Sequence, residues 1–530
     1  MKRMADWIVH PFLLGIYPVA ALLTLNLSQV GPMFAIRPAL AGLLLAGLLV
    51  IVFRLLLGNW QRAALAASLS VLFIFLYGHV HNLIVDVKVA GIEIGKHRYL
   101  AVVWLILYAT GLWFIIRKIK DLRSWTRTLN IIAILLVGIA LIQITTYEVR
   151  TSQARQRIRS NETNSVSSQL SPPAGTLPPD IYYIILDTYT RQDALLQAFG
   201  YDNSGFVSSL EQAGFYVAGC SQSNYNTTEP SLTSSLNMQY LDRLDAKFSP
   251  PNTSLSGLFP YLQNNAVLLT LQDLGYTFIA MESGYSLTEF THADVYLSPQ
   301  SDLHNLHLTG GLSPFETLLL RTSIGNFFYD THFFPRSLEN SFFDAAYLSH
   351  RDRIQFEFDR LADIPSLPGP KFIFVHILAP HNPFVFGPQG EFLNRTTPFS
   401  LNDDVDAMDS NSYISGYTGQ VTYLNRRVLE TVNQILDKSA TPPVIIIQGD
   451  HGSLRTPEWN MTILNGYYLP GEGNQLLYSS ISPVNTFRLI FNAYFGGQLE
   501  LLPDLACDSP EGDPFNCVVA PDPNPACIVP

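Results

Sequence analysis

Five apolar runs in the first 150 residues constrain the fold of this chain more than any other feature of its sequence. They cover roughly residues 11–27, 38–57, 63–85, 99–116 and 129–146. Each run is close to the ~20 residues that an α-helix needs to cross a ~30 Å hydrocarbon core. A cleaved signal peptide would account for the first run alone. We therefore predict a membrane region with five transmembrane helices within residues 1–148.

The distribution of basic residues predicts the orientation of these helices. With the N-terminus inside, the inner segments carry nine basic residues: Lys2, Arg3, Arg54, Arg62, Arg117, Lys118, Lys120, Arg123 and Arg127. The outer loops then carry four: Arg37, Lys88, Lys96 and Arg98. The positive-inside rule places the N-terminus in the cytoplasm. Because five is an odd number of spans, everything after residue 148 is expected outside, on a multi-pass protein of the plasma (inner) membrane.

The third apolar run is the weak point of this topology, because it ends in a polar stretch with His79, His81 and Asn82. If this run did not cross the membrane, the topology would invert. We interpret the two histidines as interfacial residues, because apolar spans commonly end in amphipathic side chains.

Composition changes after the membrane region and predicts three further segments. Residues 149–178 are rich in Ser, Asn, Thr and Pro, which is typical of a linker. Residues 179–500 alternate short apolar runs with longer amphipathic ones and form the predicted catalytic domain. Residues 501–530 form a tail rich in Cys and Pro. The Phe- and Tyr-rich stretch 303–347 has two open interpretations, a substrate groove or an inserted helical segment.

The alternation in residues 179–500 predicts an α/β domain with a mostly parallel central sheet flanked by helices. Expected strands cover 181–186, 215–218, 277–281, 371–377 and 443–447. They are short and almost continuously apolar, as strands buried on both faces of a parallel sheet are. Expected helices cover 203–213, 345–362 and 412–439, and their alternation with the strands indicates helices on both faces.

Charge and cysteine content exclude some classes of function. The net charge is −11 and no basic stripe follows residue 160, so nucleic-acid binding is not expected. The four cysteines are Cys220, Cys507, Cys517 and Cys527. They form no Cys-x-x-Cys pair of the kind that binds zinc. Disulfides in an oxidising compartment are the preferred interpretation and free thiols the alternative. The pairing stays open.

Acidic and histidine side chains follow three of the expected strands. Asp187 follows the first, Asp450 and His451 follow the last, and His381 follows the strand that contains His376. In open α/β sheets, ligands bind at the carboxyl ends of the strands. Oxygen donors combined with imidazole suit a divalent cation such as Mn²⁺ or Zn²⁺. Taken singly, each residue has a plainer role as a helix cap, a turn residue or a core histidine.

The ordered set of motifs resembles the alkaline phosphatase/sulfatase superfamily over roughly residues 179–500. DIYYIILDTYTR is similar to its first strand and metal-binding acid, HILAPHNPF to its His-x-Pro segment, and QGDHGS to its Asp-His metal pair. Sulfatases carry Cys-x-Pro-x-Arg before a helix of small residues. If Thr228 takes the place of that Cys, four further residues fall on matching positions: Pro230, Ser231, Ser234 and Leu236.

The resemblance implies a set of roles. Asp187, Thr228, Asp450 and His451 would hold one divalent metal, Mn²⁺ or Zn²⁺, with Mg²⁺ or Ca²⁺ as alternatives. Thr228 would be the nucleophile, with Thr227 as its main rival. Metal coordination activates a hydroxyl, and a helix that begins there aims N–H groups at an anionic ester. His381 and His376 would bind substrate oxygens, or a weaker second ion.

One departure from the family pattern narrows the function. Thr228 cannot become formylglycine, and Leu232 stands where those sulfatases have Arg. Threonine nucleophiles characterise a membrane-bound branch that resembles lipoteichoic acid synthases and phosphoethanolamine transferases. We therefore expect a transferase that takes a phosphoryl-type group from a membrane lipid. The alternatives are an exported phosphatase, phosphodiesterase or divergent sulfatase, and a domain that keeps the fold for binding alone.

Overall fold

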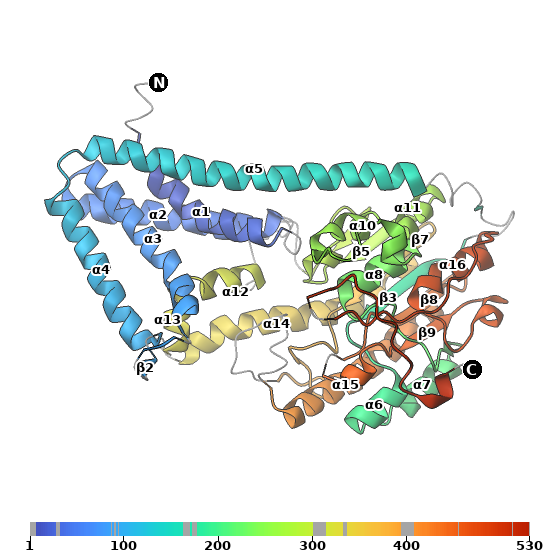
Figure 1. The fold of residues 1–530 in the computed structure, drawn as a ribbon. Helices are drawn as coiled ribbons and strands as arrows, with labels where there is room; N and C mark the ends of the chain where they lie inside the picture. The colour runs from blue at the N-terminus through green and yellow to red at the C-terminus, as the bar shows by residue number, and fades with distance from the viewer. Residues whose placement is uncertain are drawn as a thin grey trace. The chain divides into compact units, whose positions relative to one another are not determined.

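The computed structural model describes residues 7–27, 32–85, 87–89, 92–93, 95–162, 170–171, 178–299, 314–331, 336–393, 408–453, 455–510 and 512–528. The chain divides into two compact units (Figure 1). The helical unit comprises residues 1–149, 300–346 and 397–399, and the α/β unit comprises residues 150–299, 347–396 and 400–530. The stretch with the two open interpretations therefore belongs mostly to the helical unit and is helical where it is described.

The helical unit contains all five predicted spans as helices. They are α1 (His10–Leu25), α2 (Ile36–Leu57), α3 (Trp60–Ile84), α4 (His97–Arg117) and α5 (Leu122–Glu162). Two short strands, β1 (Lys88–Val89) and β2 (Ile92–Glu93), pair between α3 and α4. The helices α12 (Pro314–Arg321) and α13 (Gly325–Asp330) complete the described part of this unit.

Four helices of this unit, α2 to α5, are long and apolar enough to cross a membrane, whereas α1 is apolar but has 16 residues. Their apolar side chains are turned outward. In α4, Val102, Leu105 and Ile106 are each more than half exposed. An apolar surface of this extent is stable against lipid and would aggregate in water, so the helical unit is a membrane domain. The third span, whose polar end left the topology open, continues as a helix past His81.

The α/β unit is built on a seven-stranded sheet in the order β4-β9-β8-β3-β7-β5-β6. Its strands are β3 (Ile181–Leu186), β4 (Tyr216–Val217), β5 (Thr277–Met281), β6 (Val295–Leu297), β7 (Lys371–Ile377), β8 (Val444–Gly449) and β9 (Asn465–Tyr468). The strands from β8 to β6 run parallel, while β9 is antiparallel to β8 and to β4. The predicted mostly parallel sheet is confirmed, but β4 is an edge strand with an antiparallel neighbour.

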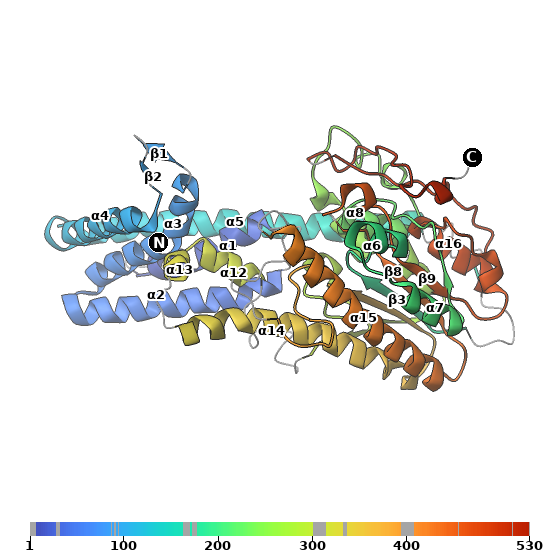
Figure 2. The ribbon, with the colours of Figure 1, turned by 90° about the horizontal axis from the view of Figure 1, so that it is seen from below.

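Helices cover both faces of this sheet (Figures 1 and 2). One face packs against α8 (Thr228–Asn237), α10 (Phe259–Gln263), α11 (Ala266–Asp273) and α16 (Pro483–Tyr494). The other carries α6 (Gln192–Phe199), α7 (Ser204–Gln212) and α15 (Ser410–Lys438). The remaining helices are α9 (Leu241–Leu244) and α14 (Arg336–Leu361). The residues of α14 are divided between the two units, and α5 continues through Glu162 into the segment predicted as a linker.

The alternation of side chains along the strands determines which residues lie on each face of this sheet. Ile181, Tyr183 and Ile185 of β3 lie in the core beneath α8, as do Phe372 and Phe374 of β7. Val444 and Ile446 of β8 lie in the same core. Because successive side chains of a strand alternate between faces, this face continues with position 187 after β3, position 376 in β7, and positions 448 and 450 in and after β8.

Candidate metal centre and nucleophile

Asp187, His376 and Asp450 extend the sheet face that packs against α8. The strands that supply them, β7, β3 and β8, are adjacent in the sheet. Leu186 pairs with Gly449, so Asp187 and Asp450 stand level just beyond their strands, and Ile185 pairs with His376. Alternation and register thus bring together three side chains that are widely separated in the sequence. One donor atom from each lies within 4.8 Å of the others, and all three residues are buried.

Close polar distances extend this cluster to His451 and Thr228. The Nε2 atom of His376 lies 3.6 Å from Oδ2 of Asp187. The Nε2 atom of His451 lies 3.6 Å from Oδ2 of Asp450 and 3.4 Å from Oγ1 of Thr228. The four predicted ligands are therefore near one another, and His376 joins them as a fifth candidate. From sequence, His376 was expected to contact substrate oxygens or a weaker second ion.

Both imidazoles of the cluster are held through their Nδ1 atoms. His451 donates from Nδ1 to the carbonyl oxygen of Gly452 at 2.8 Å. His376 contacts the hydroxyl of Thr288 through Nδ1 at 2.9 Å. Metal-binding histidines in proteins are usually oriented in this way, by a partner on the ring nitrogen that does not bind the ion. Each ring therefore presents Nε2 toward the carboxylates.

The burial and charge of the cluster fit a divalent cation. Within the described residues, His376 Nε2 and Asp450 Oδ2 are buried atoms with no hydrogen-bond partner, which is costly unless another group is bound. Burial lowers the pKa of His376 to about 4, so its ring is neutral near pH 7. Burial alone would raise the pKa of Asp450, but His451 and the hydrogen bonds from the Thr188 amide and the Thr228 side chain hold it below its usual value. A neutral imidazole and an ionised carboxylate are the forms that bind metals.

Asp450 is fixed in place by a strained turn after β3. Its Oδ1 atom accepts hydrogen bonds from the backbone amides of Thr188 and His451, both at 2.9 Å. Thr188 has a φ of 61°, which is uncommon for a β-branched residue and costs on the order of 1–3 kcal/mol. Gly449 lets the two strand ends approach, because a Cβ there would lie 2.3 Å from the carbonyl oxygen of Tyr189.

Thr228 is the first residue of α8, and Thr227 is its N-cap. The hydroxyl of Thr227 makes no capping hydrogen bond, whereas that of Thr228 faces His451. The hydroxyl of Ser231 donates to the carbonyl oxygen of Asp450 at 2.6 Å, which fixes the first turn of α8 to the loop after β8. Of the two threonines left open by the sequence, Thr228 is the one whose hydroxyl contacts the cluster.

His381 lies in the loop after β7, and its backbone ties that loop to the cluster. Its amide donates to the carbonyl oxygen of Asp187 at 3.1 Å, and its own carbonyl accepts from Gln420 at 3.1 Å. Its Nδ1 atom contacts the carbonyl oxygen of Asn382. A hydrogen on Nδ1 makes Nε2 the basic nitrogen of the neutral ring.

Three further residues around the cluster were not identified from the sequence. Thr288 orients His376. Tyr285, from the same loop after β5, donates to Oε1 of Glu229 at 2.6 Å, and its ring stands edge-on to that of His376 with centroids 6.2 Å apart. Glu229 directly follows Thr228. No motif marks Thr288 and Tyr285, because they reach the site from a loop whose path depends on the folded sheet.

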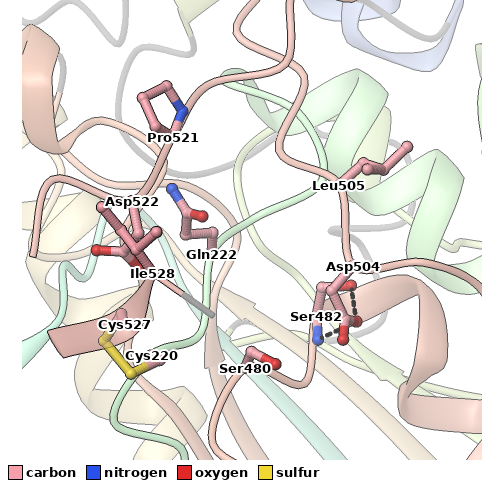
Figure 3. A pocket seen from close by; sticks show the side chains of 10 residues that line it. All are labelled: Cys220, Gln222, Ser480, Ser482, Asp504, Leu505, Pro521, Asp522, Cys527 and Ile528. Atoms are coloured by element: carbon pink, nitrogen blue, oxygen red, sulfur yellow. Dashed lines mark hydrogen bonds between the residues drawn. A yellow bond between two sulfur atoms is a disulfide. The ribbon is translucent and has the colours of Figure 1, made fainter. Parts of the chain in front are cut away.

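The tail is attached to the rest of the α/β unit by one disulfide and an ion pair. Cys220 bonds to Cys527 of the tail, and Cys507 bonds to Cys517 within the tail, so the preferred disulfide interpretation is confirmed. Arg191 pairs with Asp522 of the tail at 2.8 Å. A pocket of about 220 Å³ lies beside Cys220–Cys527 (Figure 3). Asp504, which lines it, already accepts hydrogen bonds from Ser482, and no residue of the candidate metal centre lines it.

No known family profile and no curated protein sequence matches this chain. Among solved structures it is similar to the membrane protein lipooligosaccharide phosphoethanolamine transferase A from Neisseria meningitidis, with 12% identity, 91% of this chain and 93% of that chain covered, and a TM-score of 0.39. It is also similar to the periplasmic domain of phosphoethanolamine transferase EptC from Campylobacter jejuni, with 13% identity, 64% and 94% covered, and a TM-score of 0.37.

The periplasmic domain of EptC from Escherichia coli in complex with Zn is a further match, with 12% identity, 59% and 82% covered, and a TM-score of 0.37. These structures belong to one of the two groups of enzymes that the sequence motifs resemble. Their TM-scores lie below 0.5, so the roles assigned to residues below rest on the side chains of this chain.

Proposed function

We propose that this chain is a metal-dependent, membrane-anchored transferase that takes a phosphoryl-type group from a phosphodiester through a covalent phosphothreonine at Thr228. The observation that carries this proposal is the position of the Thr228 hydroxyl. It lies at the start of a helix, 3.4 Å from Nε2 of His451, beside the buried cluster of Asp187, His376 and Asp450. A threonine that only capped the helix would need none of these neighbours.

The types of ligand atom in this cluster indicate which metal ion it would bind. Carboxylates and imidazoles together suit Zn²⁺ or Mn²⁺ better than Mg²⁺ or Ca²⁺, which prefer oxygen donors alone. Asp187, Asp450, His451 and Thr228 would hold the ion, with His376 as a further ligand. A bound divalent ion would lower the pKa of the Thr228 hydroxyl and offset the negative charge of the phosphodiester.

The residues of the chain then have distinct tasks. Thr228 gives up its hydroxyl proton, and Oγ1 forms a bond to phosphorus while the ester bond to the lipid alcohol breaks. His381, whose Nε2 is the basic nitrogen, takes up that proton and returns it to the leaving oxygen, or it binds the transferred group. An acceptor hydroxyl next attacks the phosphothreonine, and its proton passes to Oγ1 as Thr228 is released. The backbone N–H groups at the start of α8 stabilise the charge on the phosphoryl oxygens.

The membrane domain fits a donor that is a lipid, since it would keep the α/β unit close to the bilayer surface. The excess of basic residues in the inner segments supports an α/β unit on the extracytoplasmic side of the plasma membrane. The oxidising conditions of that compartment agree with the two disulfides. Water as the acceptor would make the same site a phosphatase or phosphodiesterase.

The test uses the full chain in detergent, loaded with Zn²⁺ or Mn²⁺, against a fluorescent phospholipid and against chromogenic phosphodiester, phosphomonoester and sulfate esters. Thr228→Ala is compared with Thr227→Ala, its neighbour in the same loop. We expect phosphodiester cleavage that Thr228→Ala abolishes and Thr227→Ala retains, with a phosphorylated Thr228 peptide found by mass spectrometry. Activity that survives Thr228→Ala, or cleavage of sulfate esters alone, would overturn the proposal. Product release without transfer to any added alcohol would favour the hydrolase.

A further inference from the structure

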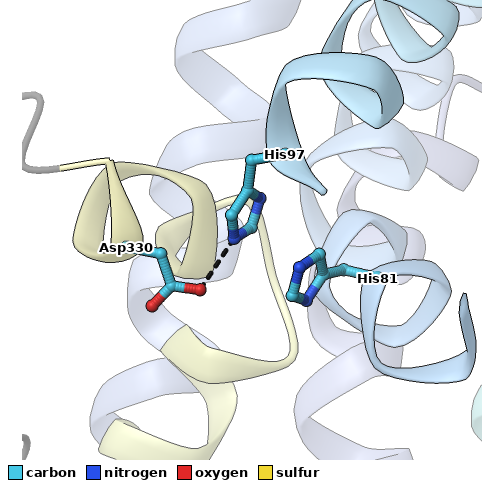
Figure 4. Close-up of side chains that lie close together, drawn as sticks. All are labelled: His81, His97 and Asp330. Atoms are coloured by element: carbon cyan, nitrogen blue, oxygen red, sulfur yellow. Dashed lines mark hydrogen bonds and ion pairs between the residues drawn. The ribbon is translucent and has the colours of Figure 1, made fainter. Parts of the chain in front are cut away.

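A second cluster of metal-binding side chains lies in the helical unit. His81 comes from the last turn of α3, His97 is the first residue of α4, and Asp330 is the last residue of α13 (Figure 4). One donor atom from each of the three lies within 4.8 Å of the others. The sequence interpretation of His81 as an interfacial residue does not explain this convergence, because His97 and Asp330 are 233 residues apart.

The geometry of the cluster brings both imidazoles to one carboxylate. Nε2 of His97 lies 2.7 Å from Oδ2 of Asp330. The rings of His81 and His97 stack with centroids 3.9 Å apart and planes within 4° of parallel. A hydrogen bond between His97 and Asp330 alone would not require His81, which is nonetheless buried. Because an imidazole binds a metal in the plane of its own ring, one of the two stacked rings would rotate when both bind the same ion.

Each imidazole is also held by a polar partner on Nδ1. The hydroxyl of Tyr77 lies 3.0 Å from Nδ1 of His97 and can accept its hydrogen, as the partners of metal-binding histidines do. The amide nitrogen of Asn326 donates to Nδ1 of His81 at 3.2 Å, and a half-turn of this amide would present its oxygen to Nδ1 instead. Two imidazoles and one carboxylate, with water as a further ligand, form a common zinc ligand set.

We propose that His81, His97 and Asp330 bind a divalent cation of the zinc class, at a site separate from the candidate metal centre of the α/β unit. The ion would fasten the end of α13 to the ends of α3 and α4. The preceding turn already lies on α3, since Ile324 donates to the carbonyl oxygen of Ile74 at 2.7 Å and the amide of His79 donates to that of Thr322 at 3.2 Å. A metal at the far end of α13 would secure this segment at both ends.

The experiment measures bound zinc directly. The full chain in detergent is stripped with a chelator, dialysed against zinc alone, and analysed by mass spectrometry for ions per chain. We expect about two zinc ions in the wild type and about one in His81→Ala, His97→Ala and Asp330→Asn. His79→Ala is the matched control, because it removes an exposed histidine of the same helix, and it should retain both ions. Asp187→Asn should lose the other ion.

The outcomes separate the two sites. Unchanged zinc content in all three cluster variants would overturn the proposal, whatever Asp187→Asn does. One ion per chain that disappears in His97→Ala and persists in Asp187→Asn would support this site and contradict the metal centre of the proposed enzyme. A histidine variant that fails to fold would not test zinc binding. Asp330→Asn conserves the size of the side chain, so it tests the site even in that case. Thermal unfolding with and without zinc gives a second measurement, in which the zinc-dependent rise in melting temperature should be smaller in Asp330→Asn than in His79→Ala.

Discussion

Two clusters of histidine and aspartate occur among the residues that the structure describes, and they differ in architecture and in solvent exposure. The cluster of the α/β unit lies at the ends of three adjacent strands, and the side chains of His376 and Asp450 are fully buried. The cluster of the helical unit lies at helix ends, and the side chain of Asp330 is 36% exposed. In the first, buried atoms lack partners unless an ion is bound. In the second, His97 and Asp330 satisfy each other.

This difference in solvent exposure indicates which cluster is suited to catalysis. A buried site with fixed donors stabilises charge strongly, because little solvent screens it. A partly exposed site at helix ends can hold an ion, but water competes for its ligands, so the site stabilises charge less strongly. We therefore assign catalysis to the strand-end cluster and a structural role to the helix-end cluster.

The largest expected effect tests this division of roles. Thr228→Ala should reduce phosphodiester turnover by about 1,000-fold or more, because it removes the attacking atom. His97→Ala should change turnover by only about threefold, since it removes a ligand of the structural site alone. The measurement is kcat and KM for the full chain in detergent with saturating metal. If His97→Ala were as inactive as Thr228→Ala, the two clusters would not be functionally distinct.

Much of the strand-end cluster could be predicted from sequence because strand periodicity is a local property. The runs 181–186, 277–281 and 371–377 were predicted with the bounds that β3, β5 and β7 have. Their continuous apolar character follows from burial on both faces. Each polar residue after such a run then falls at a known edge of the sheet. The membrane helices were predictable for the same reason, since hydropathy is also read locally.

The parts that sequence missed depend on contacts between distant segments. The strand β6 has three residues and β9 contains Gly466, so neither has the length or composition of a clear strand. His376 was assigned to substrate oxygens or to a weaker second ion, although its alternation with Phe372 and Phe374 could have placed it on the face of Asp187. Thr288 and Asp330 carry no motif at all. Their roles depend on a loop and an inserted helix whose positions are set only in the folded chain.

The next largest effect concerns Thr288, whose hydroxyl contacts Nδ1 of His376. Thr288→Val keeps the shape of the side chain but removes the hydroxyl on Nδ1 of His376, and it should weaken zinc binding at the strand-end cluster by about 10- to 100-fold. Competition with a chromophoric chelator measures this affinity, with the helix-end ligands removed by His97→Ala in both proteins. Thr418→Val is the control, because the Thr418 hydroxyl donates to the carbonyl oxygen of Ile414 in its own helix. Equal affinities for Thr288→Val and the control would contradict the role of Thr288 in orienting His376 for zinc binding.

Two glycines allow a similar comparison of stability, with effects of about 1–3 kcal/mol expected from overpacking. A Cβ on Gly449 would lie 2.3 Å from the carbonyl oxygen of Tyr189, and one on Gly78 would lie 2.4 Å from that of Arg321. Gly449→Ala should lower turnover, because it displaces Asp450. Gly78→Ala should lower zinc binding by the helix-end cluster and leave turnover near the wild-type value. Gly205→Ala, where a Cβ would meet nothing within 4 Å, is the control for both.

The smallest expected effect concerns the outer partner of His97 in the partly exposed helix-end cluster. Tyr77→Phe removes the hydroxyl on Nδ1 of His97, as Thr288→Val does for His376. We expect zinc binding at the helix-end cluster to weaken by only about threefold, the value of one modest hydrogen bond. The reason is that water around the partly exposed Asp330 can substitute for a lost polar contact, whereas nothing replaces it around the buried His376. The same chelator competition, performed in an Asp187→Asn background, measures this affinity. A loss in Tyr77→Phe as large as in Thr288→Val would mean that solvent exposure does not govern how strongly each cluster depends on its outer partners.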